Sequence, residues 1–336
     1  MDVDPHNFGL LTRKSQSRIV KYRNCLPECL FLGLDSRLRL FLNGLFPEGE
    51  LLPGLRILTP YQDGPHHGPV EIEFLETTPV DRMLTVSESR QVGAFIALSS
   101  YLGLSDCHRS NLAVGFSQEK FIFTSLDWET ILSPVRNAYD LAFFRAKRNC
   151  SCAGNFCLSY GLYEIAPFAL TAEVLSGFTS MTVALRKSHA ELMRILQSEL
   201  LDRKWIRRAV IRDTVDYMSA MNVGNKDFFP EENEQLLRGD VPYFFQIGGT
   251  QEIYYWATPD EYKRADTASW NLPSDINHRI GSTEEFSFDV VRNIARSLDL
   301  GEKNQPSQNS EFHVHTRGDI ILIDSPRGKT FANRIY

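Results

Sequence analysis

Features of an exported or membrane-embedded protein are missing from this sequence. It has no apolar run that approaches the roughly 20 residues needed to span a bilayer. Its first residues, Met-Asp-Val-Asp-Pro-His-Asn, are acidic and polar, whereas a secretory signal starts with basic residues and continues into an apolar segment. Cysteine is scarce, with 6 in 336 residues, so a disulfide framework is not expected. The sequence therefore predicts a cytoplasmic protein with free thiols and no membrane insertion.

An excess of positive charge is missing as well. The chain has 36 Lys and Arg against 42 Asp and Glu, which gives a formal net charge of -6. Its arginines form no basic run with interleaved aromatic residues, the pattern typical of nucleic-acid binding. We therefore expect no nucleic acid among the partners. The chain does have the length and the apolar content, 336 residues of which 43% are hydrophobic, for two lobes with buried cores.

Half of the cysteines are close together in the sequence. Cys150, Cys152 and Cys157 lie on a segment that also contains Gly and Asn. A structural zinc site normally takes four ligands, and the sequence offers no obvious fourth beside these three. An unliganded loop is therefore the favoured interpretation, with metal binding as the alternative.

One segment in the first half of the chain has the residue pattern of a phosphoryl-transfer centre. Asp106, His108 and Asn111 lie on one short loop, and an apolar stretch then leads to Asp127 and Glu129. In kinase-like enzymes an Asp on such a loop positions the substrate hydroxyl and accepts its proton, while a later Asn and a second Asp bind Mg²⁺. Asp106, Asn111 and Asp127 fit these three roles. ATP and Mg²⁺ are the cofactors that this interpretation requires.

The loop pattern alone could arise by chance, because Asp, His and Asn are common in turns. Its surroundings favour the catalytic interpretation. Residues 88–102 have apolar positions at helical spacing, with Ser87 as a candidate N-cap. Residues 120–126 are typical of a buried strand. Helix, loop, hairpin and acidic strand end is the order that the C-lobe of a kinase needs.

The N-terminal part predicts a small lobe that covers a nucleotide. Residues 8–11 and 18–22 are predicted to form a hairpin, with Lys21 in its second strand. A Lys on such a strand holds the phosphates of ATP in kinase-like folds. The alternative is that Lys21 and the arginines beside it face solvent on an exposed strand. An amphipathic helix is predicted over residues 34–46, and a strand over residues 70–75 would form the hinge between the lobes.

Short motifs follow one another along the chain in an informative order. They are Asp4-Pro-His6-Asn, Val20-Lys21-Tyr-Arg23, Glu73-Phe-Leu, Ser105-Asp106-Cys-His108-Arg-Ser-Asn111, Asp127-Trp-Glu129-Thr, Arg208-Ala-Val-Ile-Arg212-Asp-Thr214-Val-Asp-Tyr217 and Leu237-Arg-Gly-Asp240-Val-Pro242-Tyr-Phe. Together they resemble the dehydratase domain of class II lanthionine synthetases, over about residues 3–300. Those enzymes phosphorylate Ser and Thr of a ribosomal precursor peptide and then eliminate the phosphate, which leaves dehydroalanine or dehydrobutyrine.

The resemblance implies an α+β, lipid-kinase-like fold with two lobes. A strand-rich N-lobe that covers the nucleotide would comprise residues 1–80, and a larger helical C-lobe would comprise residues 81–300. Beyond the resemblance, residues 301–310 are predicted to form a polar linker, and the rest of residues 301–336 to add one extra strand that has no place in the family. The implied function is that of a lanthipeptide-type dehydratase. Its implied partners are a ribosomal precursor peptide and a separate cyclase or a fuller synthetase.

The resemblance also implies roles for individual residues in phosphorylation. The residues concerned are Asp4, His6, Lys21, Arg23, Asp106, His108, Asn111, Asp127 and Glu129. Among them, Lys21 and Arg23 would bind ATP, while Asn111, Asp127 and Glu129 would hold Mg²⁺. The other four would be catalytic.

Elimination of the phosphate would use a second set of residues. By resemblance these are Arg208, Arg212 and Thr214. A bidentate guanidinium suits a departing phosphate better than a lysine does. Without the resemblance, residues 204–212 would be interpreted as a charged strand edge with solvated arginines.

The chain departs from the family in three respects. Lys21-Tyr-Arg23 lacks the Pro of the family strand, and the first motif comes almost at once, where the family has a long section that helps to bind the leader of the precursor. No cyclase domain with its zinc ligands follows, so closure of thioether rings is not expected. Two alternatives stay open: an ATP-dependent peptide kinase without elimination, and a non-catalytic relative that binds a fuller synthetase.

Overall fold

The computed structural model describes residues 5–15, 17–59, 61–133, 135, 141–143, 161–162, 164–212, 214–221, 223–248, 250–267, 280, 290–291, 293–294, 313–317, 320–325 and 328–334. Asp4 lies outside these ranges, as do Cys150, Cys152 and Cys157 and the predicted linker at residues 301–310. No helix in the described ranges is both long enough and apolar enough to cross a membrane.

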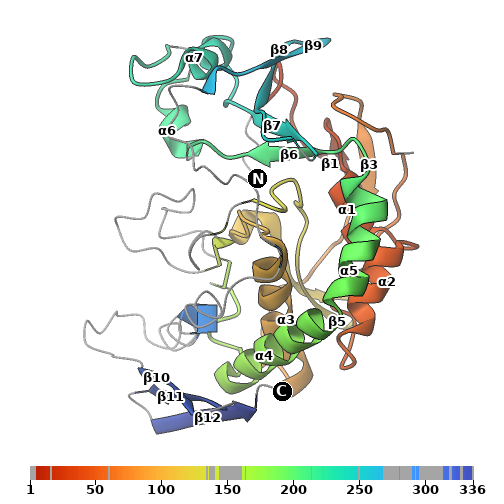
Figure 1. Cartoon of the computed structure of the whole chain (residues 1–336), viewed down its shortest axis with the longest axis vertical. Coiled ribbons are helices and arrows are strands. Elements are labelled where there is room, and N and C mark those ends of the chain that lie inside the picture. Colours follow the sequence, from red (N-terminus) through yellow and green to blue (C-terminus); the bar gives the residue numbers. More distant parts are fainter. Residues whose placement is uncertain are drawn as a thin grey trace.

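Within these ranges the protein has an α+β fold, which confirms the predicted class, with seven α-helices and four small antiparallel sheets (Figure 1). The α-helices are α1 (Leu26–Leu32), α2 (Arg37–Gly44), α3 (Val86–Leu102), α4 (Thr171–Lys187), α5 (His189–Leu196), α6 (Thr214–Met218) and α7 (Pro230–Leu237). Short turns of other helix types are η1 (Arg109–Asn111) and η3 (Gln197–Leu201). The order of strands in the sheets is β1-β2-β3, β4-β5, β6-β7-β8-β9 and β10-β11-β12.

The first sheet differs from the predicted hairpin in where it begins. It contains β1 (Arg13–Lys14), β2 (Arg18–Lys21) and β3 (Val70–Glu73), so the first strand starts well after residues 8–11. Those earlier residues form a turn that is closed by hydrogen bonds between His6 and Leu10. β3 matches the strand predicted over residues 70–75, and it pairs with β2, which ends on Lys21.

Two predicted helices are present with different starting points. The helix predicted over residues 34–46 begins at Arg37, because the hydroxyl of Ser36 accepts a hydrogen bond from the Arg39 N–H and caps it. The helix predicted over residues 88–102 is α3. Its N-cap is Thr85 and not Ser87, since Thr85 and Glu88 form a reciprocal capping box.

Helices α3 and α4 pack closely because each has a glycine at the contact. A side chain at Gly93 would overlap the backbone of Val174, and one at Gly177 would overlap the backbone of Arg90. Helix α3 ends at Gly103, whose left-handed backbone (φ 62°) releases the chain into the loop that follows. The start of that loop is therefore fixed by a tightly packed helix pair.

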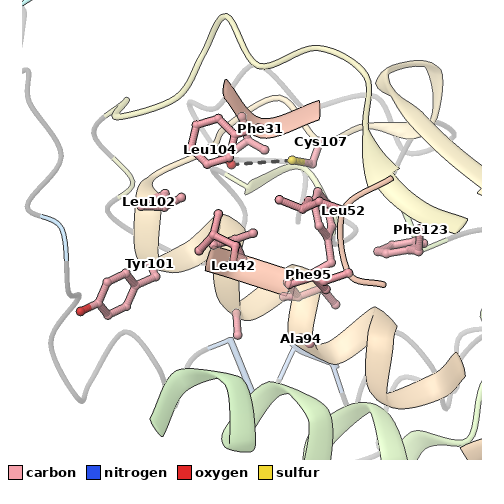
Figure 2. Close-up of a cluster of buried hydrophobic side chains, with 14 of the residues drawn as sticks. Phe31, Leu42, Leu52, Ala94, Phe95, Tyr101, Leu102, Leu104, Cys107 and Phe123 are labelled. Atoms are coloured by element: carbon pink, nitrogen blue, oxygen red, sulfur yellow. Dashed lines mark hydrogen bonds between the residues drawn. The ribbon is translucent and has the colours of Figure 1, made fainter. Parts of the chain in front are cut away.

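The same core holds the loop at a second point. Figure 2 shows Leu104 and Cys107 among buried side chains of α1, α2 and α3, including Phe31 and Phe95. Both loop residues are fully buried, and the Cys107 thiol is 3.7 Å from the Leu104 carbonyl oxygen. Because Cys107 points into the core, Asp106 and His108 on either side of it are left partly exposed.

The hairpin after the loop leads to the two predicted acids. It is formed by β4 (Leu112–Ser117) and β5 (Lys120–Ser125), and β5 matches the strand predicted over residues 120–126. Just beyond it, Trp128 is fully buried and stacks on Phe31 of α1, with ring centroids 4.1 Å apart. This contact places the residues on either side of Trp128 next to α1.

A four-stranded sheet lies at one end of the molecule, with α6 and α7 beside it (Figure 1). Its strands are β6 (Ile206–Ala209), β7 (Phe244–Ile247), β8 (Tyr254–Thr258) and β9 (Glu261–Arg264). The first described residues lie close to the start of β7, since the N–H of Val241, just before this strand, donates to the Pro5 carbonyl, 2.8 Å away. The N-terminal segment is thus part of this end of the molecule.

The C-terminal residues, from His313 to Arg334, contain more strands than predicted. Strands β10 (His313–Arg317), β11 (Ile320–Ser325) and β12 (Gly328–Arg334) form an antiparallel meander, where the sequence predicted one extra strand. Only the central strand has a continuous apolar run. The two flanking strands are polar, and the hydrophobic pattern therefore did not indicate them.

Candidate functional site

The lysine predicted to bind phosphate is the centre of a buried ion network. Lys21 is 6% exposed, and its Nζ donates to Glu28 Oε1 at 3.1 Å, to the Leu126 carbonyl at 2.8 Å and to Asp127 Oδ1 at 3.3 Å. Burial lowers the pKa of Lys21 and Asp127 raises it, and the net result is a raised pKa that keeps the ammonium charged. The alternative of a solvent-facing Lys21 is wrong.

Arg23 is the second cation of this network and is also buried, at 8% exposure. Its guanidinium contacts the carboxylates of Glu28 and Asp127, and its Nε lies 2.9 Å from Glu129 Oε2. The last residue of β2, Lys21, and Arg23 just beyond it are therefore joined by direct ion pairs to the two acids that follow β5.

The sequence did not reveal that Glu28 belongs to this network. It is fully buried on α1, and its Oε1 accepts hydrogen bonds from Lys21 and Arg23 and, at 3.4 Å, from the Trp128 N–H. An acid within an otherwise apolar segment was the available signal, because a carboxylate buried among apolar residues needs a cation. The cation could not be identified without the fold.

The predicted catalytic loop has the geometry of a tight, self-bonded turn. The side-chain Nδ2 of Asn111 donates to the backbone carbonyl of Asp106 at 3.0 Å and to Asp106 Oδ2 at 3.2 Å. His108 Nε2 lies 3.5 Å from Asp106 Oδ1. The Asn111 carbonyl in turn accepts from the Leu126 N–H at 2.9 Å, which ties the loop to the strand end that carries Asp127. The structure thus brings these four site residues together.

Asp106 is held in an unfavourable state that points to function. Its backbone is left-handed (φ 65°), and burial raises the pKa of its carboxyl in spite of the opposing charges of His108 and Arg208. Since the folded pKa of Asp106 lies above the unfolded one, the contribution of this group to stability is most favourable where it is protonated. That contribution is lost as the pH rises through the unfolded and then the folded pKa.

We therefore expect Asp106→Asn to raise the melting temperature at neutral pH. Asn keeps an acceptor for Asn111 and tolerates a left-handed backbone, while it removes the desolvated charge. Scanning calorimetry of variant and wild type across the acidic to neutral range measures the effect. The gain should shrink at acidic pH, where wild-type Asp106 is itself protonated, and a gain that does not depend on pH would contradict this explanation.

Glu129 connects Arg208 of β6 to the ion network of Lys21 and Arg23. The Arg208 Nη1 lies 3.0 Å from Glu129 Oε1, and its backbone N–H donates to the Glu129 carbonyl at 2.8 Å. The charge of Arg208 also reaches Asp106 and Asp127, where it lowers both pKa values against the opposing effect of burial. Of the three residues predicted to act in elimination, Arg208 thus lies close to the predicted catalytic loop.

Glu129 has little capacity left for a metal ion. Its Oε2 accepts from Arg23 and, at 3.0 Å, from the Tyr243 hydroxyl, whose pKa is raised by burial and by Glu129 so that it stays protonated. With Arg208 on Oε1, both carboxylate oxygens are occupied. We interpret Glu129 as the residue that holds Arg23 and Arg208 side by side.

His6 reaches the same place from the N-terminal segment. Its Nδ1 donates to the Val241 carbonyl at 2.7 Å, and its ring edge faces Tyr243 with centroids 5.5 Å apart. Because a carbonyl can only accept, the proton of the neutral ring is on Nδ1. Burial, together with the Arg208 charge, lowers the pKa of His6 to about 3, so the ring is neutral and Nε2 is an acceptor.

The other two residues predicted to act in elimination, Arg212 and Thr214, lie in the part of the fold that holds α6 and α7. The Arg212 Nε lies 2.9 Å from Glu232 Oε1 of α7, which also accepts from the Tyr217 hydroxyl at 2.6 Å. Thr214 is the first residue of α6. Within the described ranges no direct ion pair or hydrogen bond joins Arg212 to the network of Lys21.

The site has few oxygen ligands for a metal ion. They suit Mg²⁺ that is also bound by substrate phosphates better than a metal ion held only by protein side chains. No cluster of three or more His, Cys, Asp or Glu in the described ranges could hold a metal ion. Mg²⁺ is commonly held by one or two carboxylates together with the phosphates of a substrate. Asp127, with a side chain 26% exposed, and the amide oxygen of Asn111 fit this mode of binding.

A scan against models of known protein families gives no match to this chain, and a search of curated proteins gives none either. The functional interpretation therefore depends on the geometry of the site and on the motifs in the sequence.

Proposed function

We propose that this protein is an ATP-dependent dehydratase of the lanthipeptide type. It phosphorylates Ser and Thr of a ribosomal precursor peptide and then eliminates the phosphate to give dehydroamino acids. The observation that supports this most strongly is the position of Lys21, between Glu28 of α1 and Asp127 beyond β5. In protein kinases a strand lysine pairs with a helix glutamate, and activity requires both this ion pair and the contact of a nearby aspartate with Mg²⁺.

The fold that goes with this function is lipid-kinase-like. The N-lobe of residues 1–80 contributes Lys21, Arg23 and Glu28, and the C-lobe of residues 81–300 contributes the catalytic loop. The network between them contains three cations, Lys21, Arg23 and Arg208, which can together bind a triphosphate or a phosphorylated side chain.

Each half-reaction has a residue with a defined task. In the first, the substrate hydroxyl oxygen bonds to the γ-phosphorus, its proton passes to Asp106, and the bond from phosphorus to the oxygen of the departing ADP breaks. Asn111 and Asp127 would hold Mg²⁺, which would neutralise charge on the phosphates. In the second, a base takes the α-proton, the Cα–H electron pair forms the double bond to Cβ, and the Cβ–O bond breaks. The leaving phosphate takes up one proton from solvent and departs as HPO4²⁻ toward Arg208.

The setting of the proposed activity is the cytoplasm, where ATP and newly made precursor peptides are both present. A separate cyclase or a fuller synthetase would act on the dehydrated peptide. A peptide kinase without elimination is the second candidate, because Arg212 contacts α7 and not the network around Lys21.

Glu28→Gln tests the proposal at the residue that supports it most. The variant keeps the shape of the side chain but removes the charge that orients Lys21, and we expect phosphorylation to fall by a factor of about 10 to 100. The assay is mass spectrometry of a Ser- and Thr-containing precursor peptide after incubation with protein and Mg²⁺-ATP. Products heavier by one phosphate, or lighter by one water, mark the two steps.

Glu71→Gln is the matched control. Glu71 lies on β3 in the same sheet, and its ion pair with Arg18 is largely exposed, so its loss should leave the rate unchanged. Equal rates for Glu28→Gln and Glu71→Gln would show that the Lys21–Glu28 pair has no catalytic role.

A further inference from the structure

The segment that carries His6 has an unusual backbone. Asn7, Phe8 and Gly9 follow one another with φ values of 50°, 70° and 74°, and Phe8 is a residue that rarely adopts this conformation. Three consecutive left-handed residues persist only where their surroundings impose them. The cause should therefore be a contact with a residue outside the segment.

Asp240 provides that contact. It is fully buried in the loop between α7 and β7, and its two carboxylate oxygens accept from the Phe8 and Gly9 N–H groups, each at 2.7 Å. Arg238 completes the arrangement, since its Nε lies 2.6 Å from Asp240 Oδ2 and its guanidinium is over the Phe8 ring at 4.1 Å. Successive backbone N–H groups in a left-handed turn form a concave site for an anion, and here the anion is the Asp240 carboxylate.

The residue next to Asp240 connects this turn to the candidate site. The residue after Asp240 is Val241, whose N–H donates to Pro5 and whose carbonyl accepts from His6 Nδ1. His6 is then fixed from both sides, by the turn that follows it and by Val241. Its ring faces Tyr243, whose hydroxyl donates to Glu129, the partner of Arg208.

We propose that Asp240 is a positioning residue that sets the place and the tautomer of His6 by clamping the backbone of Phe8 and Gly9. The clamp keeps Nε2 of His6 unprotonated, so that it can accept a hydrogen bond from a substrate. The placement of His6 follows from the geometry alone, whereas its effect on turnover depends on the proposed function.

The first measurement does not depend on turnover. In the wild-type protein, amide hydrogen exchange of Phe8 and Gly9 should be as slow as that of the paired amides of β7, although both residues lie in a loop. Exchange as fast as that of an exposed turn such as the one at Asp260 would overturn the proposal, even if no variant of Asp240 can be purified.

The second measurement uses Asp240→Asn, which replaces one carboxylate oxygen by an NH2 group. This NH2 group cannot accept the hydrogen bond that a backbone N–H of Phe8 or Gly9 donates to that oxygen in the wild type. By ¹⁵N NMR, with His6→Gln to assign the signals, His6 of the wild type should be a single Nδ1-protonated tautomer at neutral pH. In Asp240→Asn it should become a mixture that titrates near the ordinary histidine value of about 6.5. Unchanged His6 shifts in a folded variant would overturn the proposal, whether or not the wild type transfers phosphate.

A third measurement connects the clamp to turnover. Asp240→Asn should lower kcat by about tenfold with the KM for ATP unchanged, and this loss should disappear in a His6→Gln background, since both changes act through one ring. Asp260→Asn, an exposed acid in the turn between β8 and β9, should match the wild type. Fully additive effects of Asp240→Asn and His6→Gln would show that Asp240 does not act through His6.

Discussion

Asp127→Asn is expected to abolish phosphorylation of the peptide while the protein stays folded. The substitution keeps the shape of the side chain and removes the carboxylate that would hold Mg²⁺ with Asn111. Loss of a single charge contact of this kind costs on the order of 10²-fold or more in rate. The variant is assayed by mass spectrometry of the precursor peptide with Mg²⁺-ATP.

The fold should survive because the two cations retain other partners. Burial raises the pKa of Asp127 and the charges of Lys21 and Arg23 lower it, with a net pKa well below the usual range, so the ionised carboxyl stabilises the native state at neutral pH. Asp127 accepts a charged hydrogen bond from each of the two cations, each worth about 1.5–3 kcal/mol, and the amide oxygen of Asn can still accept from both. Lys21 and Arg23 still contact Glu28, and Arg23 still contacts Glu129.

Asp63→Asn is the control for this experiment. Asp63 is exposed and pairs with Arg203 on the surface, so its substitution tests the loss of an acid without the loss of the site. A well-folded Asp127→Asn protein that makes phosphopeptide at the rate of Asp63→Asn would remove Asp127 from the mechanism.

Arg208→Ala should separate the two half-reactions, so that phosphorylated peptide accumulates and dehydrated product disappears. The guanidinium of Arg208 would bind the departing phosphate, and its removal should slow elimination by a factor on the order of 10². Asp106, Asn111 and Asp127 are unchanged in this variant, and phosphorylation should therefore continue. The intermediate is detected as peptide that is heavier by one phosphate.

Companion variants show what the guanidinium contributes. Arg208→Lys keeps the positive charge but not the bidentate geometry, and it should show a smaller accumulation of the same intermediate. By the family resemblance, Thr214→Ala should behave like Arg208→Ala although Thr214 is on α6. If Arg208→Ala binds ATP but makes neither product, Arg208 belongs to the first half-reaction. A wild type that only phosphorylates would favour the peptide kinase.

Sequence reasoning performed best where the pattern is local and strongly periodic. The helix ending at Leu102 and the strand starting at Lys120 were predicted because their apolar spacing is regular over many residues. The first strand was misplaced because residues 8–11 have the apolar content of a strand but are bent into a turn by Asp240, a contact that spans most of the chain. Local propensity carries no information about such a contact.

In the candidate site, too, features that depend on neighbouring residues could be predicted, whereas contacts between residues far apart in the sequence could not. The loop from Asp106 to Asn111 could be recognised because its residues are adjacent in the sequence. The burial of Lys21 could not be deduced, since its partner Asp127 comes from a distant strand end, and Glu28 was overlooked for the same reason. An ion network is a property of the fold, and a strand with several basic residues looks the same in sequence whether it is buried or solvated.

Binding of Mg²⁺-ATP is the measurement that tests the central claim most directly, because it needs no knowledge of the peptide. Ligand that binds the native state raises its stability, by about 2.7 kcal/mol at a concentration of 100 times Kd. We expect millimolar Mg²⁺-ATP to raise the melting temperature of the wild type by several degrees, and to raise that of Asp127→Asn far less. If the wild type shows no shift with Mg²⁺-ATP, the network around Lys21 is structural and the protein is not a phosphotransferase.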